Sequence, residues 1–409
     1  MRILILTHNF PPQVGGISTH CYEMARHWSR RDEVWVLAPR AVGKNSELAR
    51  FGAEIVRMPA ARGRLARLLA TLWWTLRLAR RIHPDVIYGT HWRNCGIALR
   101  LAGMLAGIPF FLAVHGSEVL ELLGPRKKGA LVLFRWVAAG CRGFVALGGY
   151  QQQILEKLGI DRAKVFTSPE GMDFSRLANI SQNDASGIRA RHKLDGARVI
   201  LTVGRLVERK GHDSVIQALP RVLAEVPDAV YLVVGRGPEE DRLRALACAS
   251  RVEDCVVFCG FVPETELMAY YLACDVFAMP NREVGGDTEG FGIVFVEAGA
   301  CGKPVVGGRS GGAVEVIRDG VTGFLVDPED VEETARALVR LLRDPKLAAE
   351  FGRAGRARVE RQYCYQQIAD NIKSFLLGRS LSELKVPPAL NLPSADGPGE
   401  TRDHDVAMS

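Results

Sequence analysis

The feature that most constrains the fold is a series of short apolar runs that alternate with helical patterns. In the first half of the chain these runs are RILILTH, DEVWVLAP, AEIVRMP, PDVIYGTH, PFFLAVHG, GFVALGG and KVFTSPEG. Helical periodicity fills several of the intervals, for example residues 18–31 and 66–82. Strands that alternate with helices in this way form a parallel sheet covered on both faces. The first half therefore predicts one α/β unit.

The same rhythm restarts after the polar stretch 179–196, which we interpret as a joint. The second series of apolar runs is RVILTVGRL, AVYLVVGRG, CVVFCGFV, CDVFAMP, KPVVGG and GFLVDP. Helical periodicity recurs over residues 212–227, 239–250 and 264–274. A chain of 409 residues is also too long for one ordinary core. We predict an α/β fold of two Rossmann-like, doubly wound domains that face a central cleft.

Four segments follow from this division. We expect an N-terminal Rossmann-like domain at residues 1–195 and a C-terminal one at 196–362. A helix at 363–378 is expected to pack back on the N-terminal domain. Residues 379–409 are rich in Pro, Gly and acidic side chains, a composition that predicts a disordered tail.

Neither a targeting segment nor a metal site is evident in the sequence. The start, MRILILTHNF, lacks the long apolar run of a signal peptide, and no stretch of 18 apolar residues exists. The tightest cysteine pair, Cys255 and Cys259, has no nearby His or second Cys pair to complete a zinc site. We expect reduced thiols, no bound metal, and a cytoplasmic protein that does not span a membrane.

Charge is distributed unevenly along the chain. Residues 1–195 hold 28 Lys+Arg and 14 Asp+Glu, or +14, and the remainder holds 25 and 32, or −7, which together give the formal net charge of +7. A basic first half indicates an anionic partner. No helix-turn-helix, zinc-finger or aromatic RNA-binding pattern is present, so we expect no nucleic acid. A lipid surface and a phosphorylated acceptor both fit.

The most basic stretch, residues 62–83, contains six arginines and no acid. On a helical wheel one face, expected to pack on the sheet, consists of Leu65, Leu68, Leu69, Leu72 and Leu76. The opposite face consists of Arg67, Trp74, Arg77 and Arg81. A basic face with an exposed Trp suits an anionic bilayer, and Lys127 and Lys128 in a nearby loop add charge. The alternative is a solvated cationic face.

Two strand-to-helix turns carry groups that suit an anionic ligand. Gly15 and Gly16 precede a helix, so their N–H groups can approach an anion there, although a tight turn alone also explains them. After VILTVGR, Arg205 and Lys210 combine a planar fork of donors with a compact charge, which suits a diphosphate. For Arg209 a solvated loop is an equally good interpretation.

Histidines and acids occupy other strand ends. His115 closes the strand FFLAVHGSE at the expected cleft, and His91 has a weaker claim one strand earlier. A lone His is more often structural. Glu289 and Glu297 lie in GDTEGFGIVFVEAGACGKPVV, where a buried carboxylate is costly unless it is paired. We interpret both acids as facing sugar hydroxyls; the alternative is a capping Glu289 and a core Glu297 paired with a basic residue.

Taken together, these motifs resemble a known enzyme family. EGFGIVFVE with its E-x7-E spacing, VGRLVERKG, the GG loop and the HG strand end are similar to the retaining glycosyltransferases of family 4, which have the GT-B fold. The resemblance extends from residue 1 to about 375. The segment FAMPNREVGGDTEGFGIVFVEAGACGKPVVGGRSGGAVE is particularly similar to GDP-mannose-dependent phosphatidylinositol mannosyltransferases. The chain departs from the family at Glu170–Asp173, where EGMD replaces the frequent Asn-Gly-Val-Asp.

The resemblance implies a role for each motif, with the acceptor bound by the first domain and the donor by the second. Gly16, Arg205 and Lys210 would bind the donor diphosphate. His115 and Glu289 would be catalytic and hold the transferred sugar, and Glu297 would bind the ribose. The sugar would also contact the amides of Phe291, Gly292 and Ile293. No metal or other cofactor is required, because the cations and a helix terminus balance the departing diphosphate.

The expected reaction is retaining transfer of a hexose, with mannose favoured, from a nucleotide-diphosphate sugar. The acceptor would be lipid-linked or a glycan, in cell-envelope glycan or glycolipid synthesis at the inner face of the cytoplasmic membrane. One alternative is a UDP-sugar-dependent family 4 transferase with a soluble acceptor. A nucleotide-sugar epimerase would need acids and histidines arranged to move a sugar proton. An NAD-dependent oxidoreductase would need G-x-G-x-x-G after the first strand, which is absent.

Overall fold

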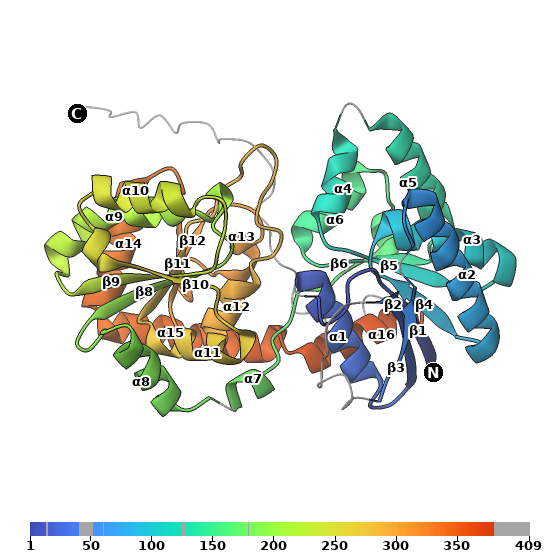
Figure 1. Cartoon of the computed structure of the whole chain (residues 1–409), viewed down its shortest axis with the longest axis horizontal. Helices are drawn as coiled ribbons and strands as arrows, with labels where there is room; N and C mark the ends of the chain where they lie inside the picture. The colour runs from blue at the N-terminus through green and yellow to red at the C-terminus, as the bar shows by residue number, and fades with distance from the viewer. Residues whose placement is uncertain (14, 41–51, 60, 125–126, 179, 380–409) are drawn as a thin grey trace, which may run out of the picture.

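The chain forms two α/β lobes that lie side by side in the computed structural model (Figure 1). The structure describes residues 1–379 apart from 14, 41–51, 60, 125–126 and 179. All of the apolar runs named above form strands, seven in one sheet and six in the other. From residue 380 on, the predicted disordered tail lies outside the described residues.

The first lobe is built on a parallel sheet with the strand order β3-β2-β1-β4-β5-β6-β7. Its strands are β1 (Arg2–Leu6), β2 (Glu33–Pro39), β3 (Glu54–Met58), β4 (Val86–Gly89), β5 (Phe110–Val114), β6 (Gly143–Ala146) and β7 (Val165–Thr167). The order reverses between β1 and β4, and such a reversal opens a crevice at the carboxyl ends of the strands.

Helices cover both faces of this sheet. They are α1 (Gly16–Trp28), α2 (Arg64–Ile82), α3 (Ile97–Ala106), α4 (Ser117–Leu120), α5 (Lys128–Gly140) and α6 (Gly149–Lys157). Alternate residues of β1 enter different cores, because side chains in a strand point to opposite faces. Ile3 and Ile5 pack with α1, whereas Leu4 and Leu6 pack on the side of α2, α3 and α5.

The second lobe repeats the plan with the parallel order β10-β9-β8-β11-β12-β13. Its strands are β8 (Arg198–Val203), β9 (Ala229–Val234), β10 (Val256–Gly260), β11 (Val276–Met279), β12 (Val305–Gly308) and β13 (Gly323–Val326). Its helices are α8 (Gln182–Arg191), α9 (His212–Glu225), α10 (Glu240–Ala249), α11 (Glu264–Ala273), α12 (Ile293–Ala300), α13 (Ala313–Val316), α14 (Val331–Arg343) and α15 (Pro345–Gln362).

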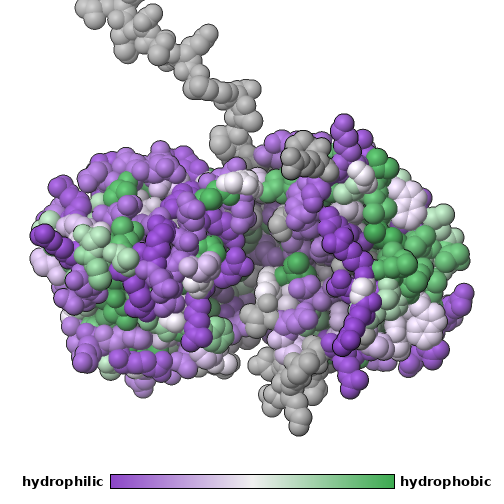
Figure 2. Space-filling model, turned by 45° about the horizontal axis from the view of Figure 1, so that its top comes forward, coloured by the Kyte–Doolittle hydropathy of each residue, from purple (hydrophilic) through white to green (hydrophobic). Residues whose placement is uncertain are grey.

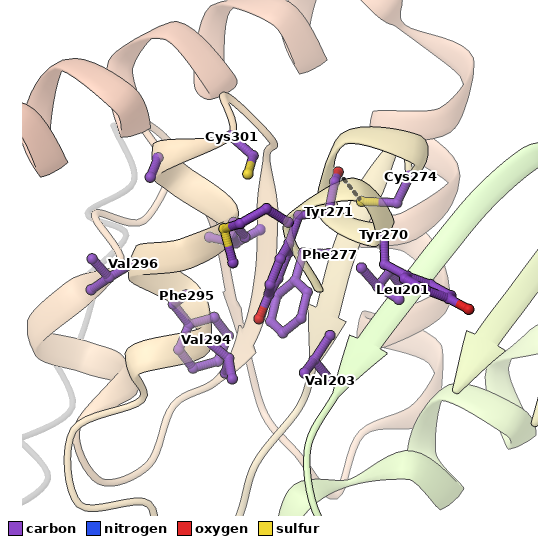
Figure 3. Packing of buried hydrophobic residues seen from close by; sticks show 14 of the residues in the cluster. Leu201, Val203, Tyr270, Tyr271, Cys274, Phe277, Val294, Phe295, Val296 and Cys301 are labelled. Carbon is purple, nitrogen blue, oxygen red and sulfur yellow. Dashed lines mark hydrogen bonds between the residues drawn. The ribbon is translucent and has the colours of Figure 1, made fainter. Parts of the chain in front are cut away.

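An aromatic cluster packs between α12 and the sheet of the second lobe. Tyr271 and Phe295 both contact Phe277 on β11, with ring centroids 5.6 Å apart in each case. Figure 3 shows these side chains gathered between α11, α12 and the sheet, with Cys274 and Cys301 nearby. Because protein interiors are close-packed, this cluster fixes the position of α12 relative to the strands.

The polar stretch 179–196 is not a simple joint, which corrects the sequence interpretation. It contains α8, and Ala185, Ile188 and Leu194 are buried in the core of the second lobe. These few apolar side chains were hidden among many polar ones. Residues 182–195 therefore pack with the second lobe, although 195 was predicted to end the first.

The chain crosses between the lobes twice. The outward crossing follows β7 and includes the short helix α7 (Ser175–Ala178), and the return lies between α15 and α16 (Tyr365–Leu376). The two crossings are paired, because Met172 N–H donates to the Tyr363 carbonyl at 2.6 Å. Helix α16 then packs on α1, where Trp28 Nε1 donates to the Ala369 carbonyl at 2.8 Å (Figure 1).

Candidate active site

The turn after β1 leaves the start of α1 open. Gly15 has φ 149°, a backbone conformation that L side chains rarely adopt. A Cβ added at Gly15 or Gly16 would meet nothing within 4 Å. The backbone at Gly15 and Gly16 is therefore uncrowded, which suits the approach of an anion to this helix N-terminus.

Two cations and one carboxylate meet at the mouth of β8. Lys210 Nζ contacts Glu289 Oε2, and Arg209 Nη1 donates to the same oxygen at 2.8 Å. Burial raises the pKa of Glu289, but Lys210 and Arg209 outweigh it and hold that pKa below its ordinary value. The Arg205 side chain, on the same turn after β8, is exposed. Arg209 and Lys210 thus gather around the ionised carboxylate of Glu289.

Sequence reasoning undervalued Arg209. A solvated loop was considered equally plausible for it, yet Arg209 also bonds Asp287 through Nε at 3.0 Å. The signal available in the sequence was its place directly before Lys210 in VERKG. It did not reveal that the loop carrying Glu289 would fold over both cations.

The Glu289 loop is held by glycines on its other side. Gly312 N–H donates to the Glu289 carbonyl at 2.7 Å, and a Cβ added at Gly312 would lie 2.4 Å from Phe291 Cα. At Gly292 the backbone is left-handed, with φ 83° and ψ 50°, directly before Ile293 begins α12. The amides of Phe291, Gly292 and Ile293 thus stand at a helix start, next to Glu289.

Glu297 lies deeper, one helix turn into α12. Its Oε1 accepts a hydrogen bond from Arg176 Nη1 at 3.0 Å, and its Oε2 accepts one from the Tyr271 hydroxyl at 2.8 Å. The side chain is 8% exposed. The alternative interpretation, a core acid paired with a basic residue, therefore describes its contacts here. Arg176, on α7, was not singled out from the sequence, because its partner lies 121 residues away.

His115 lies where the two lobes touch. Its backbone N–H donates to Glu118 Oε1 at 2.7 Å. Gln151 Nε2 donates at 3.2 Å both to the His115 carbonyl and to the carbonyl of Gly290. Gln151, on α6, thus joins the two predicted catalytic segments, the one at His115 and the one at Glu289. Nothing in the sequence around Gln151 indicated this role.

A second contact between the lobes lies beside the first. Glu315 of α13 accepts N–H bonds from Gly149 and Tyr150 at the start of α6, both at 2.9 Å. Burial raises the Glu315 pKa, and the two N–H bonds oppose that rise. A carboxylate of one lobe therefore occupies a helix N-terminus of the other.

The crevice side of the first lobe carries two further histidines. His8 follows β1, and burial lowers its pKa to about 4, with His91 and Arg67 adding to the effect. His91 follows β4, and its Nδ1 accepts a bond from Arg93 N–H at 3.2 Å.

The predicted faces of the basic helix α2 are wrong in part: Arg67, Arg77 and Arg81 are exposed as expected, but the apolar face and Trp74 were misplaced. The buried residues of α2 are Thr71, Thr75, Leu78, Ala79 and Ile82, whereas Leu65 and Leu69 are exposed. Trp74 packs against the core, and Trp73 is the exposed tryptophan, with Arg77 5.3 Å from its ring centre. The wheel failed because leucines occur on both sides of α2, so apolar periodicity could not choose the buried one.

Apolar side chains are exposed on neighbouring helices as well. We define the outer apolar face as Leu65, Leu69 and Trp73 of α2, Met104 and Leu105 of α3, and Val132, Leu133 and Trp136 of α5. Helix α3 packs against both α2 and α5. Figure 2 shows hydrophobic side chains gathered on the outer side of the first lobe. No helix in the described part of the chain has the length and apolar content to cross a bilayer.

Comparison with known proteins identifies both lobes. A family model described as "Glycosyltransferase Family 4" matches residues 14–176, and one described as "Glycosyl transferases group 1" matches residues 185–358. The chain is 36% identical to a GDP-mannose-dependent alpha-(1-6)-phosphatidylinositol monomannoside mannosyltransferase of Mycolicibacterium smegmatis, over 87% of this chain and 92% of that one. It is 30% identical to a GDP-mannose-dependent monoacylated alpha-(1-6)-phosphatidylinositol monomannoside mannosyltransferase of Corynebacterium glutamicum, over 92% of this chain and 97% of that one.

Solved structures share the fold. Anabaena HepE in complex with UDP superimposes with a TM-score of 0.76 at 24% identity, covering 93% of this chain and 100% of that one. Sucrose-phosphate synthase from Thermosynechococcus elongatus gives a TM-score of 0.74 at 20% identity, covering 92% and 98%. These likenesses confirm the predicted GT-B architecture.

Proposed function

The chain belongs to the family 4 glycosyltransferases, and on that premise we propose that it transfers mannose from GDP-mannose to a lipid-linked acceptor with retention of configuration. The meeting of Arg209, Lys210 and Glu289 at the crevice is the observation that carries this proposal. The two relatives described above are named as GDP-mannose-dependent enzymes acting on phosphatidylinositol mannosides.

In the proposed donor complex the diphosphate lies between the start of α1 and the cations. Gly16 N–H would contact one phosphate, and Arg205, Arg209 and Lys210 would balance the negative charge. Lys210 and Arg209 already share Glu289, so an incoming diphosphate would compete for the same cations. The positive charge of Arg205, Arg209 and Lys210 would offset the negative charge of the diphosphate, which supports transfer without a bound metal.

The sugar would lie between the lobes, against His115, Glu289 and the amides of Phe291, Gly292 and Ile293. Gln151 supports this placement, because it bonds the main chain on both sides. Glu297 would receive the ribose. Its pairing with Arg176 and Tyr271 leaves lone pairs on both carboxylate oxygens for ribose hydroxyls.

We propose front-side attack for the transfer step. The acceptor oxygen forms its bond to the anomeric carbon on the face from which the diphosphate leaves, as the bond from that carbon to the phosphate oxygen breaks. The acceptor proton passes to an oxygen of the departing diphosphate, and GDP is released. Product configuration by NMR tests this directly, since an inverted anomer would overturn it.

The acceptor would approach the first lobe from a membrane surface. Arg67, Arg77 and Arg81 of α2, with Lys127 and Lys128 at the start of α5, supply positive charge. The outer apolar face supplies side chains that insert at the interface. We therefore place the enzyme on the inner face of the cytoplasmic membrane as a peripheral protein.

A UDP-sugar donor is the second candidate, favoured by the UDP-bound structural neighbour. The experiment that separates the two measures thermal shift and slow donor hydrolysis with GDP-mannose, UDP-glucose, UDP-N-acetylglucosamine and UDP-galactose. Ligand binding adds to folded-state stability, so the true donor gives the largest rise in melting temperature. If a UDP-sugar gives the largest rise, the GDP-mannose proposal fails and the family assignment stands.

A further inference from the structure

Glu170 lies between two histidines at the outward crossing, outside every role assigned above. Its Oε1 is 3.9 Å from His115 Nδ1, and its Oε2 is 3.9 Å from His20 Nδ1. The Tyr365 hydroxyl donates to Oε2 at 3.3 Å. The Glu170 side chain is only 12% exposed, so its position is set by these neighbours.

The site is built from several parts of the first lobe. The titratable groups around Glu170 are His20 and Cys21 of α1, Tyr88 of β4, His115 after β5, and Tyr365 of α16. Gly171 is needed for this geometry, because a Cβ there would lie 2.6 Å from Tyr365 Cδ1. The tyrosine thus packs directly on the loop that carries the carboxylate.

The main chain of His115 is held on both sides. Its backbone N–H is bound by Glu118 and its carbonyl by Gln151. Burial, and then the neighbouring His20 and His91, hold its pKa well below the ordinary value, so the ring is neutral at physiological pH. A neutral imidazole donates from one nitrogen and accepts at the other. His115 Nε2 is buried and has no hydrogen-bond partner among the described residues.

We propose that Glu170 is a positioning residue, whose ionised carboxylate draws the proton of neutral His115 to Nδ1 and leaves Nε2 to accept a hydrogen bond from a hydroxyl of the transferred sugar. The proposal rests on the function above only in placing the sugar beside His115. His20 is the second histidine on this carboxylate, and its Nε2 lies 2.9 Å from the Tyr88 hydroxyl.

Glu170 changes its charge near neutral pH. Burial raises its pKa from 4.5 to about 7, and the Tyr365 hydrogen bond opposes that rise. Above pH 7 the carboxylate is charged and favours the Nδ1–H tautomer of His115. Below pH 7 the carboxyl carries its own proton and loses that preference. The tautomer of His115 is thereby coupled to pH although the histidine itself does not titrate there.

The test is to record ¹⁵N NMR spectra of the histidine-labelled full-length protein between pH 6 and 8.5. The two tautomers differ in which ring nitrogen has the pyrrole-type shift, and the spectrum of H115Q assigns the His115 signals. We expect the Nδ1–H form in the wild type above neutral pH, with a midpoint near the Glu170 pKa. In Glu170→Gln the tautomer should be independent of pH.

Tyr365→Phe provides a second variant that keeps the carboxylate. Because the tyrosine hydrogen bond lowers the Glu170 pKa, its loss should move the tautomer midpoint to higher pH. In donor hydrolysis, kcat of the wild type should fall about tenfold below the midpoint, the value of one neutral hydrogen bond. In E170Q this tenfold fall in kcat at low pH should be absent.

Two results would overturn the inference. One is a His115 tautomer that follows pH identically in the wild type and E170Q, with both folded by melting temperature. The other is a midpoint unchanged in Y365F. Neither result would change which donor gives the largest rise in melting temperature, so the proposed function can stand without this role for Glu170. Conversely, a panel that rejects GDP-mannose does not alter the tautomer result.

Discussion

Arg176 pairs with two acids: its Nη1 lies 3.0 Å from Glu297 Oε1, and its Nη2 lies 3.3 Å from Glu264 Oε1. The arginine belongs to α7 on the outward crossing, whereas Glu297 lies inside α12 of the second lobe. The second acid of the E-x7-E motif is thus fastened to the segment that connects the lobes. Its position depends on the crossing as well as on its own helix.

Replacing Arg176 with Ala should lower the free energy of unfolding by ~3 kcal/mol, because it leaves the buried Glu297 carboxylate without its cation. The matched control is Arg191→Ala, whose partner Glu266 is 42% exposed. An exposed pair contributes under about 1 kcal/mol. Urea denaturation of both variants measures the difference, and equal losses would contradict it.

Lys210→Ala should reduce kcat/KM for donor hydrolysis by about 10²- to 10³-fold, as loss of a preorganised electrostatic group does. Arg209→Ala should cost at least about tenfold, the value of one charge-assisted hydrogen bond. Arg221→Ala on α9, which removes a 56% exposed arginine from the same lobe, should leave the rate unchanged. A fully active R209A would restore the interpretation of Arg209 as a solvated loop residue.

Stability should depend on pH through Glu170. Its folded-state pKa is about 7 against 4.5, so between these values the folded state binds more protons than the unfolded chain. The free energy of unfolding therefore falls as pH rises through this window and stays lower above it. The free energy of unfolding of E170Q minus that of the wild type should increase by ~3 kcal/mol from pH 4.5 to pH 8. Parallel urea titrations at each pH give this difference, and a constant gap would refute it.

Membrane contact should depend on the exposed side of α2. The double change Leu69→Ala and Trp73→Ala should weaken binding to vesicles containing phosphatidylglycerol by at least about tenfold, because each side chain loses apolar burial. Phe261→Ala, which changes a 63% exposed residue of the second lobe, is the control. Sedimentation at low and high salt measures both. If the wild type fails to sediment with anionic vesicles at low salt, the membrane proposal fails.

Local sequence signals predicted most of the fold, for a physical reason. Strands buried on both faces are continuous apolar runs, and parallel sheets need helices between them, so the order of runs carries the topology. The same signals placed Lys210 and Glu289 at strand ends of one sheet. Parallel strand ends lie together, so the two were expected near one another, and Lys210 Nζ does contact Glu289 Oε2.

Contacts between distant segments were beyond those signals. Gln151 and Glu315 act across the boundary between the lobes, and Arg176 joins the outward crossing to α12. No local pattern specifies the partner of a polar side chain. The error at α2 has a different cause. Leu65 and Leu69 are apolar yet exposed, and periodicity assumes that apolar side chains are buried. A helix with two apolar faces breaks that assumption.

The packing of α16 on α1 has a consequence for biosynthesis. The ring of Phe375 lies 5.5 Å from the ring of Phe111 and 5.3 Å from that of Phe166, so α16 completes the core of the first lobe. A ribosome makes the first lobe's strands some two hundred residues before it makes α16. Until then the nascent chain presents an uncovered apolar groove, and a truncation before Tyr365 leaves it uncovered permanently. The core of the first lobe therefore cannot be complete until α16 has left the ribosome, although synthesis of that lobe begins first.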